Sequence, residues 1–118
     1  EVSYLLIYGE LPNSEELTSF RESITNHTLV HEDMKQFFEA YPAKAHPMGV
    51  LASMVCSLST FYPESLDPNR APEAKDLTVH RLIAKLPTLA AWSYKNAMRH
   101  PFMYPKNDLD YFRSLMPP

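Results

Sequence analysis

The chain has 118 residues, 45% of them hydrophobic, which suits one domain or part of one and is too apolar for a disordered chain. The formal net charge is −3 and no stretch is strongly basic, which argues against nucleic acid and anionic membranes as partners. Two glycines against eleven prolines disfavour hairpins and glycine-rich phosphate loops, so we expect an all-α fold without a sheet.

The first two elements are marked by their ends. Residues 2–8 form a short apolar run before Gly9, a residue typical of helix C-caps. Asn13 with Glu16 three residues later is a capping-box pattern, which predicts a helix over 14–24. The expected apolar face of that helix, at i, i+3 and i+7, is Leu17, Phe20 and Ile24.

A third helix is predicted over 31–40. Asp33 and Lys35 are expected to point outward, and Pro42 ends the helix because the residue before a proline avoids the α region. Its apolar face is predicted to contain Met34, Phe37 and Phe38.

Pro47 is well placed to open a fourth helix, over 47–62, which contains no charged residue. Because apolar residues cover most of its circumference, we expect this helix to be buried all round. Cys56, the only cysteine, lies in this run and is expected to be a small buried residue rather than a catalytic thiol.

A stripe of small side chains follows the same predicted helix at i, i+3, i+4 and i+7 spacing. Such a stripe lets another helix approach closely, so we expect it to be a subunit interface. On the opposite side of the helix, Leu51, Val55 and Leu58 are expected to pack into the chain's own core. The stripe residues are Gly49, Ala52, Ser53, Cys56, Ser57 and Thr60.

Residues 63–76 are polar and carry three prolines, so they are predicted to form a loop. A long helix should follow from residue 77 to residue 97, kinked at Pro87 and ended by His100 and Pro101. Asn107 or Asp108 is expected to cap a last helix through the apolar residues Leu109, Phe112 and Leu115.

Few residues suggest chemistry. His27 and His31 have the i, i+4 spacing of metal ligands on a helix, but the H-E-x-x-H motif is absent and His27 lies near a helix end. Capping or polar contacts are the favoured roles of both. The other histidines are scattered, and no serine lies in a nucleophile elbow. We predict no metal site and no catalytic residue.

Two long uncharged helical stretches are difficult to cover within so short a chain, because a small domain has a high surface-to-volume ratio. The chain also begins at Glu1 with apolar residues close behind. We therefore expect a piece of a longer polypeptide, an oligomer, or both.

Five segments of the chain carry recognisable motifs, in this order: 1–12 (EVSYLLIYGELP), 27–38 (HTLVHEDMKQFF), 45–67 (AHPMGVLASMVCSLSTFYPESLD), 81–95 (RLIAKLPTLAAWSYK) and 101–111 (PFMYPKNDLDY). Each of them resembles a motif of bacterial citrate synthases. Beyond Tyr111 the resemblance stops, since the family continues with an N-F-L-x-M-M pattern and this chain reads FRSLMPP.

The resemblance implies the citrate synthase fold, with residues 1–118 forming part of its large helical domain, with antiparallel buried helices. That family condenses acetyl-CoA with oxaloacetate to citrate and CoA, at the start of the tricarboxylic acid cycle, without a metal or redox cofactor. Its catalytic aspartate and histidines lie C-terminal to the matched part, so the segment alone is predicted to be inactive. A cytoplasmic homodimer or larger homo-oligomer is implied. A methylcitrate synthase segment and a non-catalytic helical interaction module are the alternatives.

Some Gram-negative members of the family bind NADH at an inhibitory site. The positions that resemble that site are His27, Thr28, Tyr62, Arg81 and Lys85. The leading arginine of the motif is Asn26 here and its methionine is Leu29, which removes a guanidinium suited to a phosphate. The alternative is that Arg81 and Lys85 pair with acids or cap helices.

Overall fold

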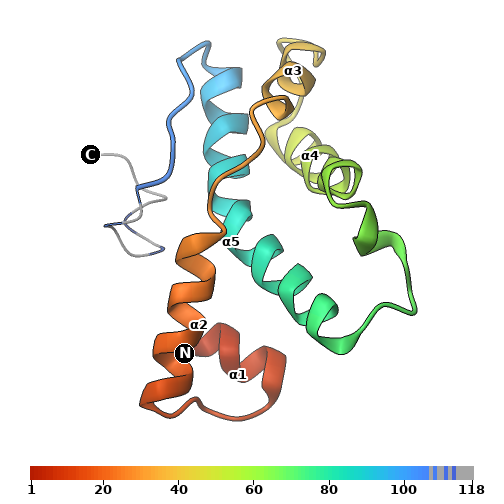
Figure 1. Ribbon diagram of the computed structural model, residues 1–118. Helices are drawn as coiled ribbons and strands as arrows, with labels where there is room; N and C mark the ends of the chain where they lie inside the picture. The colour runs from red at the N-terminus through yellow and green to blue at the C-terminus, as the bar shows by residue number, and fades with distance from the viewer. Residues whose placement is uncertain (107, 109–110, 112, 114–118) are drawn as a thin grey trace.

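A computed structural model describes residues 1–106, 108, 111 and 113, and within this part the chain is helical and contains no strand (Figure 1). The elements are α1 (Val2–Tyr8), α2 (Ser14–Asn26), α3 (Met34–Glu39), α4 (Pro47–Phe61), the 3-10 helix η1 (Pro63–Leu66) and α5 (Pro72–Ala97). The all-α expectation is confirmed. No helix among the described residues is long and apolar enough to cross a bilayer. The last helix expected beyond residue 106 falls almost wholly outside the described residues.

The predicted C-cap of α1 and the predicted N-cap of α2 are confirmed, whereas α2 continues to Asn26, two residues beyond its predicted end. Gly9 adopts the left-handed conformation with φ 79°, and its N–H donates to the Leu5 carbonyl at 2.8 Å. At the start of α2 the Glu16 N–H donates to Asn13 Oδ1 at 2.8 Å, while the Asn13 N–H donates to Glu16 Oε2 at 2.9 Å. The reciprocal bonds satisfy two backbone donors that the first turn of a helix leaves free.

Two helices begin elsewhere than predicted. Helix α3 begins at Met34 rather than residue 31, and α5 begins at Pro72 rather than residue 77. Proline suits the first helical turn, because its missing N–H would have no partner there, so the last part of the predicted loop is helix. Pro87 lies inside α5, which continues through it and changes direction near its middle (Figure 1).

Side-chain placement in α3 also differs from expectation. Phe37 is 39% exposed rather than part of the buried face. Lys35 does not point freely outward: its Nζ lies 5.5 Å from the ring centre of Trp92 and 4.6 Å from that of Tyr104. It also pairs with Glu32 at 2.9 Å. The aliphatic stem of a lysine can cover an aromatic surface while its charge stays near a carboxylate, which is why the outward prediction was wrong.

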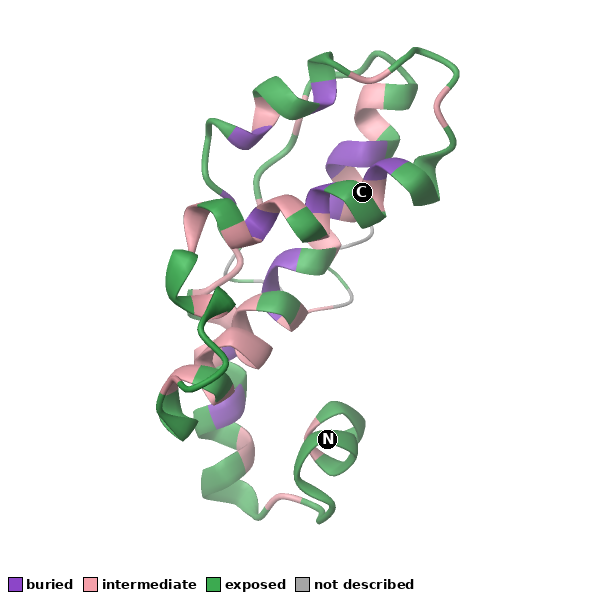
Figure 2. Ribbon diagram, turned by 90° about the vertical axis from the view of Figure 1, so that its right-hand side faces the viewer, coloured by how far each residue is buried: buried purple, intermediate pink, exposed green. Residues whose placement is uncertain are grey.

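Two clusters of buried side chains form the core, and α5 contributes to both. The larger cluster joins α3, α4 and the second half of α5 through Val30, Met34, Phe38, Val50, Met54, Leu58, Leu89 and Trp92. The smaller cluster joins α2 to the first half of α5 through Phe20, Ile24 and Ala84. Helix α1 has no buried residue and is almost wholly exposed in Figure 2.

Helix α4 is buried on one side only, which corrects the expectation that it is buried all round. Its buried residues are Val50, Met54 and Leu58, which face α3 and α5. Leu51 and Val55, expected to serve the core, are partly buried against this cluster. Cys56 is exposed rather than buried, because nothing in the described chain packs on that side of the helix.

One face of α5 carries polar side chains that donate to backbone carbonyls outside the helix. Thr88 Oγ1 donates to Thr28 O at 3.1 Å and Trp92 Nε1 to Met103 O at 2.7 Å. Asn96 Nδ2 donates to the Phe38 carbonyl, at the end of α3, at 3.3 Å. Positions 88, 92 and 96 are spaced by four, so they lie along one side of the helix. The face therefore fixes three other parts of the chain.

The end of α5 is a Schellman motif with an arginine in the left-handed position. The helix ends at Ala97, the residue at which it was predicted to end. His100 N–H donates to Lys95 O at 2.8 Å and Arg99 N–H to Asn96 O at 3.1 Å, with φ 59° at Arg99. Glycine usually occupies this position because a Cβ there is strained.

We expect Trp92→Phe to lower the free energy of unfolding by about 2–4 kcal/mol, because the smaller ring leaves a cavity and the Met103 carbonyl loses its donor. Trp92 is fully buried and stacks on Phe102 at 5.1 Å. Tyr94→Phe, at a 58% exposed position of the same helix, is the control and should change stability by less than about 0.5 kcal/mol. Urea unfolding followed by far-UV circular dichroism measures both. Equal midpoints for the two variants would contradict the role of Trp92.

Candidate functional site

Lys85 is a buried lysine that holds the segment between α2 and α3. Its side chain is 4% exposed, and Nζ donates to the His27 carbonyl at 2.8 Å and also to the carbonyl of Leu29. Residues 27–30 are not helical, so their carbonyls need partners outside a helix. Thr88 supplies the donor for the carbonyl of Thr28, between the other two.

The ring of Tyr62 lies against two cations from α5. Arg81 Cζ is 4.4 Å and Lys85 Nζ is 5.7 Å from its centre. Arg81 also forms an ion pair with Glu64 at 2.9 Å between Nη1 and Oε1. The backbone N–H of Glu64, and then the Arg81 guanidinium, hold the pKa of that carboxyl below its usual range. Tyr62 follows α4 directly, so α4 ends beside the first half of α5.

The five positions that resemble the NADH site therefore lie together. Arg81 and Lys85 already have protein partners, as the structural alternative expected. His27 Nδ1 lies 2.6 Å from the Ser23 carbonyl, one turn back on α2. An incoming phosphate would have to share these donors. NADH binding stays a prediction.

The two histidines with metal-ligand spacing have separate partners. His27 bonds to the backbone of α2, whereas the ring of His31 stacks on Phe61 with 4.7 Å between centres. His31 Nδ1 also lies 3.6 Å from Asp33. Within the described residues no group of three or more His, Cys, Asp or Glu is arranged to hold a metal ion.

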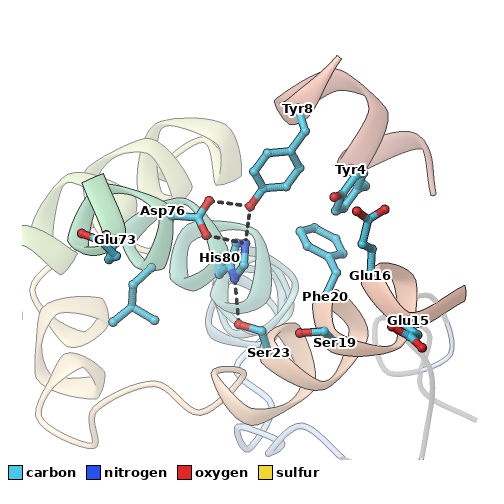
Figure 3. Close-up of a pocket in the computed structure, with 11 residues that line it drawn as sticks. Tyr4, Tyr8, Glu15, Glu16, Ser19, Phe20, Ser23, Glu73, Asp76 and His80 are labelled. Atoms are coloured by element: carbon cyan, nitrogen blue, oxygen red, sulfur yellow. Dashed lines mark hydrogen bonds and ion pairs between the residues drawn. The ribbon is translucent and has the colours of Figure 1, made fainter. Parts of the chain in front are cut away.

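A second group of polar residues lines a cleft of about 700 Å³ between α1, α2 and the start of α5 (Figure 3). Tyr8 hydroxyl donates to Asp76 Oδ1 and lies 2.9 Å from His80 Nε2. His80 Nδ1 lies 2.7 Å from Ser23 Oγ. A tyrosine has one proton to donate, so the network assigns the His80 proton to Nε2 and leaves Nδ1 to accept from Ser23.

The Ser23–His80–Asp76 combination does not form a nucleophilic triad. Ser23 lies inside α2, where the backbone N–H groups are used by the helix and cannot form an oxyanion hole. The arrangement is suited to docking α1, because the Tyr8 hydroxyl joins it to α5. Burial, and then the bond to Asp76, raises the pKa of Tyr8 to about 12.

Sequence reasoning missed this network because its members are far apart in the chain: Ser23 and His80 are separated by 57 positions, and Tyr8 and His80 by 72. Each residue alone is an ordinary polar residue on a helix. A capping box or a proline can be recognised locally, whereas this site exists only after α1 and α2 pack against α5. No local pattern in the sequence would have revealed it.

The predicted interface stripe lies on the outer side of α4. Gly49, Ala52, Ser53, Cys56 and Thr60 are exposed, and Ser57 is half-buried. Its hydroxyls turn back to the helix: those of Ser53, Ser57 and Thr60 donate to the carbonyls of residues 49, 53 and 57 at 2.9, 2.9 and 2.7 Å. The face thus presents small side chains whose polar groups already have partners.

Burial lowers the pKa of Lys85 to about 8, with a smaller contribution from the positive charge of Arg81. Between this value and the ordinary lysine pKa, the unfolded chain binds more protons than the folded one. The free energy of unfolding should therefore rise as pH increases through that interval, by up to about 3 kcal/mol.

The variant Lys85→Met, which has no group to titrate, isolates this effect. We expect urea unfolding at about pH 8 and about pH 9.5 to show the rise in the unmodified protein and a smaller rise in the variant. Parallel pH dependence in the two proteins would mean that Lys85 does not titrate in this interval.

The comparisons with known proteins agree on one family. The family model described as citrate synthase, C-terminal domain, matches residues 1–117. Citrate synthase 1 of Mycobacterium tuberculosis is 50% identical over 109 residues, which cover 92% of this chain and 25% of that protein. The chain thus spans about a quarter of the length of this curated relative.

Solved structures are similar in fold. A citrate synthase from Thermoplasma acidophilum, in a ternary complex with carboxymethyl coenzyme A and oxaloacetate, has a TM-score of 0.82 at 18% identity, over 98% of this chain and 29% of that one. The citrate synthase of Pyrobaculum aerophilum has a TM-score of 0.76 at 28% identity, over 98% of this chain and 30% of that one.

Proposed function

The chain belongs to the citrate synthase family, and we propose that it is a segment of an enzyme that condenses acetyl-CoA with oxaloacetate to give citrate and CoA. The observation that carries the proposal is the 50% identity to citrate synthase 1 of M. tuberculosis across 92% of this chain. The ternary complex of the T. acidophilum enzyme supports the substrate class. Methylcitrate synthesis, in which propionyl-CoA replaces acetyl-CoA, is the nearest alternative.

Within that enzyme we propose that this segment supplies core and interface helices and not the reacting groups. The polar groups of Lys85, Arg81 and the Tyr8 network are used to hold one part of the segment to another. Condensation would need a base for the acetyl methyl group and donors for the developing oxyanion. The described residues offer no such set at one place.

The outer face of α4 is the proposed contact with a second subunit. The stripe residues are small, so another helix can approach closely, and their hydroxyls need no outside partner. Large apolar side chains of α5, Leu82, Leu86 and Tyr94, are also exposed. Burying several of these would contribute roughly 1.5–3 kcal/mol each. A two-fold pairing of the same surface is the simplest closed assembly.

In the full-length polypeptide that carries this sequence, we expect Ser53→Glu to shift the assembly from dimer toward monomer, because the carboxylate would be buried against its symmetry mate. Light scattering measures the mass. Thr18→Glu is the matched control, since Thr18 is exposed on α2 and its hydroxyl likewise bonds one turn back, to Ser14 O at 2.8 Å. If Ser53→Glu keeps the unmodified mass and stability, the stripe does not face another subunit.

Activity assays test the reaction and the role of the segment together. The full-length polypeptide should release CoA from acetyl-CoA and oxaloacetate, and the purified 118-residue chain should not. A higher kcat/KM for propionyl-CoA than for acetyl-CoA would favour a methylcitrate synthase. No turnover with either thioester would favour the alternative that the protein is a non-catalytic helical interaction module. Turnover by the isolated chain, free of host enzyme, would disprove its non-catalytic role.

A further inference from the structure

Helix α4 begins with a histidine in the position that caps a helix. Nδ1 of His46 accepts the Met48 N–H at 3.2 Å, and the backbone of His46 is extended, with φ −66° and ψ 128°. Pro47 has no N–H, so Met48 supplies the first backbone donor inside the helix. We propose that His46 makes the start of α4 sensitive to acid, because only an unprotonated Nδ1 can accept this hydrogen bond.

The residues that usually cap helices do not change their charge near neutral pH. Serine, threonine and asparagine stay neutral, and an aspartate stays ionised down to about pH 4. An imidazole in water titrates near about pH 6.5, so a histidine cap can lose its acceptor between about pH 8 and pH 5. In the protonated ring, Nδ1–H and the Met48 N–H are two donors that face each other. A cation at this end of a helix also opposes the helix dipole.

No described acid pairs with the ring of His46. The first turn of α4 contains no acidic residue, and the charged residue nearest in the chain is Lys44, a second cation. The carboxylates on the elements packed against α4 form no ion pair with His46; they are Glu39 of α3, Glu64 of η1, and Glu73 and Asp76 of α5. A charge on the exposed ring therefore gains no partner in the described part of the chain that would replace the lost cap.

His31, before α3, shows why the surroundings matter. Its Nδ1 likewise accepts a backbone N–H two residues ahead, that of Asp33, at 3.2 Å. The Asp33 carboxylate, however, lies 3.6 Å from the same nitrogen, so it can accept the proton of Nδ1 when the ring becomes charged. Acid thus exchanges one partner for another at His31, but removes the only hydrogen-bond partner that the described residues offer to the ring of His46. The acid sensitivity therefore belongs to α4 and not to α3.

The sign of the effect follows from proton binding. The opened first turn of α4 leaves His46 free to take up a proton, whereas the capped turn needs the neutral ring. The stability of this turn therefore falls as pH decreases through the imidazole range. Gly49, Ala52 and Ser53 of the small-residue stripe lie in the first two turns of α4, so the subunit contact should also weaken in acid. This last step rests on the proposed function, whereas the cap itself does not.

Hydrogen exchange of the full-length polypeptide, measured by mass spectrometry at about pH 8 and about pH 5.5, tests the cap. We expect the protection factors of residues 48–51, which correct for the intrinsic pH dependence of exchange, to be about fivefold lower in acid. The first turn of α2, which is capped by Asn13, is the internal reference and should keep its protection.

Two variants identify the group that titrates. Asparagine caps a helix without titrating near neutral pH, so His46→Asn should keep residues 48–51 equally protected at both pH values. His100→Asn is the matched control: His100 is also exposed but lies beyond the end of α5, so the fall in protection should remain. Unchanged protection in the unmodified protein, the same fall in His46→Asn, or no fall in His100→Asn would overturn the proposal.

Light scattering at the same two pH values tests the consequence for assembly. We expect a lower mass in acid for the unmodified protein and a constant mass for His46→Asn. A constant mass in both proteins would overturn the link to the subunit contact, while the exchange data decide on the cap by themselves. Because neither measurement involves turnover, both are independent of the enzymatic assays.

Discussion

The constraint on which most of this structure depends is the need of irregular backbone for hydrogen-bond donors, which α5 supplies from its side chains. The carbonyls of residues 27–29, the end of α3 and the segment at Met103 are all held this way. A buried carbonyl without a donor costs about 1–3 kcal/mol, so each of these segments is fixed to one register of the helix. A slip of one residue would rotate the donors by about 100° and leave all of them unpaired.

This use of α5 explains the role of Lys85. A buried lysine in a helix would ordinarily suggest chemistry or a ligand, and it is among the positions that resemble a nucleotide site. Here its ammonium bonds to the His27 and Leu29 carbonyls. A methionine at the same position would fit the space but could not donate, so the residue type follows from the backbone that it supports. The same lysine and Arg81 are the two cations that lie against the ring of Tyr62.

Local signals in the sequence predicted the fold well, and contacts between distant residues account for what was missed. Asn13, Glu16, Gly9 and Pro47 act within one turn of chain, so their roles could be predicted from neighbours alone. The predicted start of α5 was wrong because the three prolines in 63–76 suggested a loop, although Pro72 suits the first turn of a helix. The exposure of Cys56 depends on which neighbours cover α4, and the Tyr8–His80 network on how three helices pack. Neither can be deduced from periodicity.

Helix α1 has a consequence for how the molecule fluctuates. It has seven residues and no buried side chain, and its contacts with α2 and α5 run through Tyr4 and Tyr8. Helices this short are unstable alone in water, and segments with little burial open locally at low free-energy cost. Its backbone amides should therefore exchange hydrogen with solvent long before those of α5. One wall of the cleft thus belongs to the least protected helix, so local opening of α1 would also open the cleft.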